Sequence, residues 1–179
     1  MRIELGDGYL VREFRQSDLA SIVEHANNSN VARNLEDRFP HPYTAKDAEE
    51  WLARIRKQDP VTNFAIADPD QVIGSIGIQL LDDVYRCTAD LGYWLGEAFW
   101  GRGIATRAVR AFTAWGFQSF DVTRIQARVF ESNPASGRVL EKAGFIFEGR
   151  LRQSAIKQGV VLDQLLYAIL RHEFEAQTS

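Results

Sequence analysis

Residues 99–106, with the sequence FWGRGIAT, constrain the fold more than any other stretch of this chain. The residues before them, 86–96, are typical of a strand, and apolar side chains recur after them at helical spacing. These apolar residues are Ala105, Ala108, Val109, Phe112 and Trp115. The stretch therefore predicts a glycine turn between a strand and a helix, which is a junction where α/β proteins bind ligands.

The glycine turn has the features of an anion site. A helix that begins near Gly103 presents unpaired backbone N–H groups at its first turn, and its dipole favours negative charge there. Gly101 and Gly103 let the backbone curve closely around an anion, and Arg102 adds a positive charge. A turn that only starts a helix explains the same residues, so both interpretations stay open on this stretch alone.

Two common phosphate motifs do not fit the turn. A P-loop needs Lys-Ser or Lys-Thr after a glycine, and the chain has neither. A dinucleotide fingerprint needs a third glycine or an alanine where this chain has Thr106, and a second strand–helix–strand repeat is missing. A dinucleotide-binding oxidoreductase is therefore a weaker alternative.

The remaining pattern predicts a mixed sheet with helices on its faces. The expected strands cover residues 9–14, 63–68, 71–81, 86–96, 124–130, 145–151 and 161–170. The expected helices cover residues 17–28, 30–35, 44–57, 103–120, 133–145 and a last turn at 171–176. Helix-capping signals support several of them: Ser17, Thr44 with Asp47, Asn133 before Pro134, and Gly144.

Composition excludes several classes of function. The 179 residues are 45% hydrophobic, carry a net charge of −3 and contain no linker-like segment, which predicts one domain over residues 1–179. Basic residues are scattered, so a nucleic-acid surface is not expected, and no apolar run is long enough for a membrane span. The start of the chain does not resemble a signal peptide, and the single cysteine, Cys87, is expected in a strand. We therefore expect a cytoplasmic protein.

No metal site is expected from the histidines. The chain has three, His25, His41 and His172, and none stands at a spacing typical of metal ligands. His41 lies between two prolines in the stretch RFPHPY, which predicts a rigid loop.

A second block, NPASGRVLEKAGF at 133–145, follows the glycine turn by about thirty residues. Together with GYWLGEAFWGRGIATRAV at 92–109, it resembles the two motif blocks of the GNAT N-acetyltransferase superfamily. The likeness is strongest to the Rim-type branch, which modifies ribosomal-protein amino termini, and it spans residues 9–170. The resemblance implies an α/β (α+β) GNAT fold. Its central sheet would be mixed and mostly antiparallel, with a splayed strand pair and helices on both faces.

The resemblance implies acetyl-CoA as co-substrate and no metal. The backbone of the strand before the turn would pair with the pantetheine arm, and the turn would hold the pyrophosphate. The implied CoA-binding residues are Tyr93, Trp94, Leu95, Gly101, Arg102, Gly103, Ile104, Ala105, Thr106, Asn133, Ser136 and Arg138. Asn133 is also a natural helix N-cap, and Arg138 is also explained as a solvated helix charge.

The resemblance indicates the proton donor and the general base less directly than it indicates the CoA-binding residues. Many superfamily members have a tyrosine as proton donor where this chain has Leu140, one helical turn after Ser136. The Rim-type branch places a serine at the position of Ser136, which makes it the expected proton donor to the thiolate. Asp90 and Asp163 are the candidates for the general base, while Glu97 and Glu131 are expected to be solvated.

The resulting hypothesis is an acetyl-CoA-dependent N-acetyltransferase in which a primary amine attacks the thioester directly in a ternary complex. The preferred acceptor is the amino terminus of a protein or peptide, and a homodimer is allowed for. A small-molecule amine is the alternative acceptor, framed like the first by the helices of residues 17–57. A non-catalytic acyl-CoA-binding module is the alternative from another class, because the tyrosine is missing at Leu140.

Overall fold

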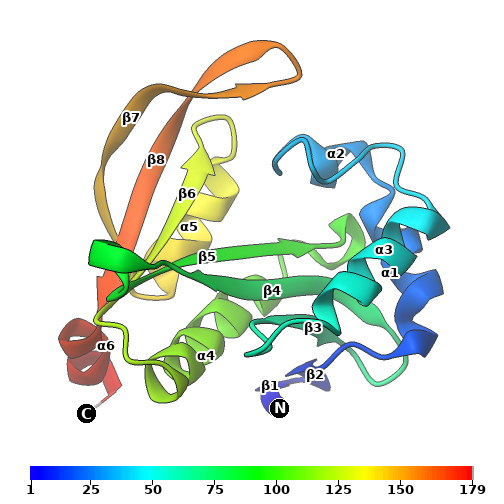
Figure 1. The fold of residues 1–179 in the computed structure, drawn as a ribbon, viewed down its shortest axis with the longest axis horizontal. Coiled ribbons are helices and arrows are strands. Elements are labelled where there is room, and N and C mark those ends of the chain that lie inside the picture. Colours follow the sequence, from blue (N-terminus) through cyan, green and yellow to red (C-terminus); the bar gives the residue numbers. More distant parts are fainter. Residues whose placement is uncertain (179) are drawn as a thin grey trace. The chain divides into compact units, whose positions relative to one another are not determined.

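The computed structural model describes residues 1–178. Over this range the chain forms eight strands in one mixed sheet, in the order β1-β2-β3-β4-β5-β6-β8-β7, with six α-helices (Figure 1). The strands are β1 (Arg2–Gly6), β2 (Tyr9–Arg12), β3 (Asn63–Ala67), β4 (Val72–Leu80), β5 (Thr88–Leu95), β6 (Arg124–Phe130), β7 (Ile146–Lys157) and β8 (Val160–Leu170). The helices are α1 (Leu19–Ala26), α2 (Ser29–Ala32), α3 (Ala45–Ile55), α4 (Ile104–Ser119), α5 (Pro134–Lys142) and α6 (Arg171–Thr178).

The sheet is mostly antiparallel, as predicted. The strand pairs β1–β2, β2–β3, β3–β4, β6–β8 and β7–β8 run antiparallel. The pair β5–β6 runs parallel, and its ladder covers only three residue pairs, from Thr88–Arg124 to Asp90–Gln126. Both strands continue beyond the last of these pairs, to Leu95 and Phe130.

The chain divides into two compact units. One unit contains residues Met1–Gly77 and Tyr93–Ala108, and the other contains Ile78–Gly92 and Val109–Ser179. Strands β4 and β5 and helix α4 each contribute residues to both. The expectation of one domain over residues 1–179 stays a prediction.

The first unit has its core between helices α1 and α3 and the strands β3 and β4. Amphipathic spacing turns one face of each helix inward, and the buried set is Ile22, Ala26, Tyr43, Ala48, Leu52, Ala65 and Val72. Helix α3 begins as predicted, because Thr44 Oγ1 accepts from the Asp47 N–H while the Asp47 carboxylate accepts from the Thr44 N–H.

The start of α1 differs from the prediction. Ser17 was expected as its N-cap, but residues 16–18 form a 3₁₀ turn and the ordering group is Asp18. Its carboxylate accepts from the Arg15 N–H at 2.7 Å and from both terminal nitrogens of Arg12 at 2.7 and 2.8 Å. Because Asp18 is only 5% exposed, this ion pair fixes the join between β2 and α1 from inside the protein.

The prediction that Tyr9 opens the first strand was wrong. Strand β1 precedes it and pairs with β2 through a two-residue turn, in which Asp7 has φ 54° and Gly8 has φ 82°. Two positive φ angles define the type of tight turn that matches strand twist, and Asp-Gly is one of its preferred sequences. The dipeptide at positions 7 and 8 was therefore a readable signal for this hairpin.

The second unit contains strands β6, β8 and β7, the helices α5 and α6 and the later part of α4. Its core includes Phe112, Ile125, Leu140 and Ile169, all fully buried. Strands β7 and β8 form a hairpin that extends past the end of β6 (Figure 1). It is longer than predicted, since β7 runs on from residue 151 to Lys157 and turns at Gln158 and Gly159.

Three other features of the chain bear on the predictions. Helix α2 begins one residue earlier than expected and ends at Ala32, and Cys87 lies directly before β5 rather than in it. Residues 38–43 form a loop, as predicted. Within residues 1–178, no helix combines the length and the apolar character that crossing a bilayer requires.

Candidate active site

The glycine turn predicted at 99–106 is present in the first unit. Gly101 has φ 75° and Gly103 has φ 72°, and helix α4 begins directly afterwards at Ile104. A Cβ added at either glycine would meet nothing within 4 Å. The left-handed backbone, and not a lack of space, is therefore what favours glycine at both positions.

The first turn of α4 can bind an anion. Its first intrahelical bond runs from the Arg107 N–H to the Gly103 carbonyl at 3.1 Å. The N–H groups of Ile104, Ala105 and Thr106 lie ahead of this bond, so the helix itself provides no partner for them. With 16 residues behind it, the helix dipole adds positive potential at the same end.

The segment between β5 and this turn is fixed by its own hydrogen bonds. The Gly96 N–H donates to the Ile73 carbonyl at 2.8 Å, and the Trp100 indole N–H donates to the Leu95 carbonyl at 2.7 Å. The Trp100 side chain therefore closes the loop. Sequence reasoning assigned Trp100 no role, since its indole partner lies five residues away in a bend that no local pattern indicates.

The two arginines of this region have different surroundings. The Arg102 guanidinium stacks over the Phe99 ring, 5.5 Å from its centroid, and the residue stays exposed. Arg107 pairs with Asp7 in the β1–β2 turn at 3.2 Å. Arg107 thus ties the first turn of α4 to the first hairpin.

Tyr93, Trp94 and Leu95 form the end of β5 in the first unit. The strand lies so close to β4 that a Cβ on Gly74 would come 2.3 Å from the Trp94 carbonyl oxygen. The Trp94 ring packs edge-on against Phe39, with 5.6 Å between ring centroids. The side chain of Trp94 therefore serves packing, which leaves the strand backbone as the part that could bind a ligand.

Asp90 lies in the second unit at the point where the β5–β6 ladder ends. Its Oδ1 accepts from Gln126 Nε2 at 2.7 Å, and its Oδ2 is 3.6 Å from an Arg128 nitrogen. The carboxylate is 28% exposed, so it keeps contact with solvent while its orientation is fixed. The sequence did not identify either partner. Gln126 and Arg128 stand two residues apart on β6, so their side chains lie on the same face of the sheet.

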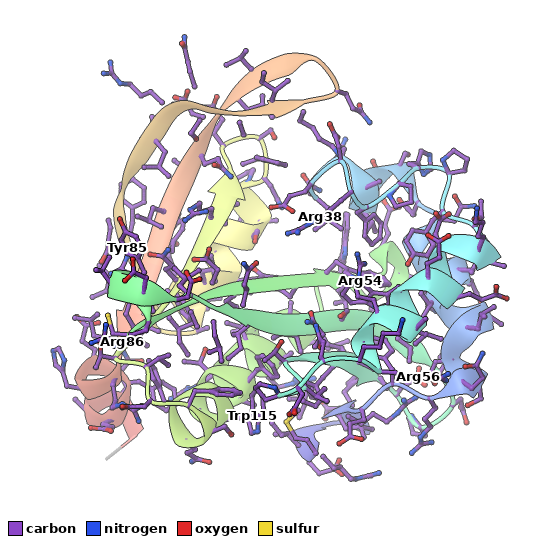
Figure 2. All side chains as sticks on the ribbon, in the orientation of Figure 1. Arg38, Arg54, Arg56, Tyr85, Arg86 and Trp115 are labelled. Atoms are coloured by element: carbon purple, nitrogen blue, oxygen red, sulfur yellow. The ribbon has the colours of Figure 1, made fainter. Side chains whose placement is uncertain are left out.

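A cavity of about 500 Å³ opens on this polar face of the second unit. Its lining residues are Leu81, Tyr85, Thr88, Arg124, Gln126 and Arg128. Figure 2 shows Tyr85 on the short turn before β5. Arg124 is paired with Glu148 and Arg128 with Asp90, so the charged groups at this face balance.

Helix α5 carries the second predicted block, and its caps are as predicted. Asn133 Oδ1 accepts from the Ser136 N–H at 3.3 Å, Pro134 is the first helical residue, and Gly144 has φ 98° just after the end. Ser136 is half-buried in the first turn, whereas Leu140 one turn later is fully buried. Leu140 is therefore a core residue, and Ser136 is the more accessible of the two.

Tyr167 on β8 packs against α5. A Cβ on Gly137 would come 2.8 Å from the Tyr167 hydroxyl oxygen, and that hydroxyl donates to Glu141 Oε1 at 3.4 Å. Burial, with a smaller effect from the Glu141 carboxylate, raises the pKa of Tyr167. The hydroxyl thus fixes α5 against the sheet, while Arg138 on the same helix stays exposed.

Asp163 is bound to the β7–β8 hairpin. It accepts from the Gln153 N–H at 2.8 Å and from Arg150 at 3.0 Å, and Arg150 also pairs with Glu131 at 2.7 Å. The backbone hydrogen bond from Gln153, then the bond from Arg150, lowers the pKa of Asp163 below its ordinary value. A carboxylate with a lowered pKa is a weaker proton acceptor.

The predicted residues thus fall into two groups. Residues Tyr93–Thr106 lie in the first unit, and Asp90, Asn133, Ser136, Arg138 and Asp163 lie in the second. Over residues 1–178, no group of three or more metal-ligating side chains is gathered. His25 stacks edge-on against Phe99, with 5.3 Å between ring centroids.

Comparison with known proteins relates this geometry to a family. The acetyltransferase (GNAT) domain family matches residues 9–146. The chain is 36% identical over 168 residues to the uncharacterized N-acetyltransferase YoaA of Bacillus subtilis, covering 92% of this chain and 94% of that protein. It is 34% identical over 105 residues to the ribosomal-protein-serine acetyltransferase of Escherichia coli, covering 59% of this chain and 58% of that enzyme.

A solved structure supports the fold. RimL, a ribosomal L7/L12 alpha-N-protein acetyltransferase in complex with coenzyme A, superposes with a TM-score of 0.83 at 19% identity, covering 95% of this chain and 98% of that one. The glycine turn at the start of α4, the short β5–β6 ladder and the family match agree with one another. The chain therefore belongs to the GNAT family of N-acetyltransferases, near its Rim-type branch, and uses a co-substrate of the coenzyme A type.

Proposed function

We propose that this chain transfers the acetyl group of acetyl-CoA to the amino terminus of a protein or peptide. The observation that carries the proposal is the turn of Gly101 and Gly103, whose left-handed backbone leads into the first turn of α4. The N–H groups of Ile104, Ala105 and Thr106 at this turn can donate hydrogen bonds to a diphosphate. One folded domain and a cytoplasmic location belong to the same proposal.

The remaining CoA contacts follow from the family pattern. The backbone of Tyr93, Trp94 and Leu95 would pair with the pantetheine arm in the manner of an added strand. Asn133 Oδ1 already caps α5, so a contact of this residue with CoA would be a hydrogen bond donated by its Nδ2 group. Arg138 is exposed and free to approach a terminal phosphate, so its contribution would weaken as ionic strength rises.

The chemistry needs one proton acceptor and one proton donor. An ammonium group has no lone pair, so the amine must lose a proton before its nitrogen bonds to the thioester carbonyl carbon. Attack leaves the nitrogen of the tetrahedral intermediate positively charged, so it loses a second proton as the intermediate collapses. The carbon–sulfur bond breaks and the CoA thiolate takes up one proton, so that the reaction releases one proton overall. We assign the donor to Ser136 and the acceptor to Asp90, acting directly or through water. Asp163 is the weaker candidate, because its two hydrogen bonds favour the ionised form.

The charges around the cavity beside Asp90 favour one class of acceptor amine over another. Spermidine N(1)-acetyltransferase of Escherichia coli is 22% identical over 169 residues, so a polyamine is the rival acceptor. A polycation needs a surplus of carboxylates, whereas Arg124 with Glu148 and Arg128 with Asp90 balance here. A peptide amino terminus brings a single positive charge, which Asp90 can balance when its contact with Arg128 loosens.

An acceptor screen tests the proposal. Free thiol is measured after mixing the enzyme with acetyl-CoA and either peptides with free amino termini, spermidine, or the same peptides with blocked amino termini. We expect turnover with the free peptides and none with the blocked ones. Turnover with spermidine alone would replace the proposed acceptor, and tight CoA binding without turnover on any amine would favour the acyl-CoA-binding module.

A further inference from the structure

The loop between β5 and α4 is held to the start of α2 by one carboxylate. Glu97 Oε2 accepts from Asn28 Nδ2 at 2.7 Å, and Glu97 Oε1 accepts from Asn30 Nδ2 at 2.9 Å. Each carboxylate oxygen therefore has its own amide donor, although the residue lies at the surface. The exposure of Glu97 agrees with the solvated position expected from the sequence. The hydrogen bonds from Asn28 and then Asn30 lower the pKa of Glu97 and keep it ionised.

Asn28 links this contact directly to the folding of α2. Its Oδ1 accepts from the N–H groups of Asn30 at 2.8 Å and Val31 at 3.3 Å, which makes it the N-cap of the helix. Because the oxygen is committed to the cap, the amide nitrogen is left to face Glu97. One side chain thus joins the first turn of α2 to the loop that leads into Gly101 and Gly103.

Ring contacts fix the same loop against α1. His25 packs edge-on against Phe99, and Arg102 stacks over the same Phe99 ring. A Cβ on Gly96 would come within 3.0 Å of His25 Cβ, so the loop backbone approaches α1 closely. The loop therefore rests on both α1 and α2, and Glu97 supplies its charged contact.

We propose that Glu97 is a positioning residue that couples CoA binding on the turn at 101–106 to the segment 27–43. This inference rests on the proposed function in one respect, since the acceptor is expected among the helices of residues 17–57, which include that segment. When CoA orders the turn, Glu97 passes that order to Asn28 and Asn30. By thermodynamic linkage, order imposed on α2 by an acceptor strengthens CoA binding equally.

A swap of hydrogen-bonding groups tests the coupling. Glu97→Gln removes the negative charge and one of the two accepting oxygens, so Asn30 keeps a bond to it only by turning its amide over. Asn30→Asp sets two carboxylates against each other. In the double variant Glu97→Gln with Asn30→Asp, the new amide nitrogen can donate to the new carboxylate, while its oxygen still accepts from Asn28. The charge of this pair is the same as in the wild type, so the double variant restores both the bonds and the electrostatics.

The primary readout is the dissociation constant of CoA from calorimetric titration, which requires no acceptor. We expect each single variant to weaken CoA binding by roughly tenfold, the scale of one hydrogen bond to a charged group, and the double variant to recover most of it. The matched control is Glu24→Gln on α1, which removes the same charge from an exposed residue and should bind CoA as the wild type does.

Hydrogen exchange shows whether the order reaches α2. Upon CoA addition we expect slower amide exchange in peptides covering residues 27–43 in the wild type and the double variant, but not in Glu97→Gln. Unchanged CoA affinity in a folded Glu97→Gln protein, or a double variant no better than the singles, would overturn the inference. Failure of the peptide acceptors alone would instead contradict the proposed function, because neither readout here depends on the amine.

Discussion

Replacing Gly103 by alanine should weaken CoA binding without disturbing the rest of the protein. Gly103 has φ 72°, and a Cβ there would meet nothing within 4 Å, so the substitution introduces no clash. Its cost is the left-handed backbone, about 1–2 kcal/mol for a residue with a Cβ. In the free protein the loop can relax away from this strain, whereas binding the pyrophosphate requires the original conformation.

The strain energy then appears in the affinity for CoA. A difference of about 1–2 kcal/mol corresponds to a dissociation constant raised roughly 5- to 30-fold. Calorimetric titration with CoA measures it, and the acetyl-transfer assay should show a similar rise in KM for acetyl-CoA. Thermal unfolding without ligand should change little, because the loop can relax before CoA binds.

Two glycines serve as matched controls for this substitution. Gly159 has φ 81° and open space around it at the turn of the β7–β8 hairpin, so Gly159→Ala carries the same strain away from the turn at 101–106. Gly149 also has open space but no left-handed backbone, so Gly149→Ala carries none. Both should bind CoA as the wild type does. Wild-type CoA affinity in folded Gly103→Ala would refute the role given to the turn.

Three further predictions concern catalysis and stability. Ser136→Ala should lower kcat by about 100-fold with little change in KM for acetyl-CoA. The helix cap should survive the change, because Asn133 binds the backbone N–H of residue 136 and not its side chain. A variant with full kcat would show that Ser136 is not the proton donor. Asp18→Asn should reduce the free energy of unfolding by about 3–5 kcal/mol in denaturant titrations, since it leaves buried Arg12 unpaired, and a loss within the error of measurement would contradict that role. The pKa of Asp163 is lower in the folded than in the unfolded protein, so its contribution to stability is complete above the unfolded pKa and is lost as pH falls through the folded pKa. Asp163→Asn should therefore lower the free energy of unfolding at neutral pH and lower it less in acid. An equal loss at both pH values would contradict the assignment.

Local chemistry explains what the sequence predicted well. The caps at Thr44 and Asn133 depend on side chains within three residues of the N–H groups they bind, so short patterns identify them. The turn at Gly101 and Gly103 is similar, because a left-handed backbone selects glycine wherever it occurs. These local signals fixed α3, α5 and the start of α4.

The errors arose where structure depends on distant partners or on an overlooked turn. Ser17 resembled an N-cap, but the buried pairing of Asp18 with Arg12 decided how α1 begins. Glu97 is exposed as predicted, but its two amide donors were missed because they lie 67 and 69 residues earlier in the chain. The Asp7-Gly8 turn of the first hairpin was a local signal that the strand pattern at residues 9–14 overshadowed.

The central claim is that backbone N–H groups at the start of α4 hold the pyrophosphate of CoA. Amide NMR spectra recorded during titration test it directly when CoA is compared with pantetheine, which has no pyrophosphate. We predict large shifts at Ile104, Ala105 and Thr106 with CoA and small ones with pantetheine. CoA binding that leaves these three amides unshifted would contradict the account.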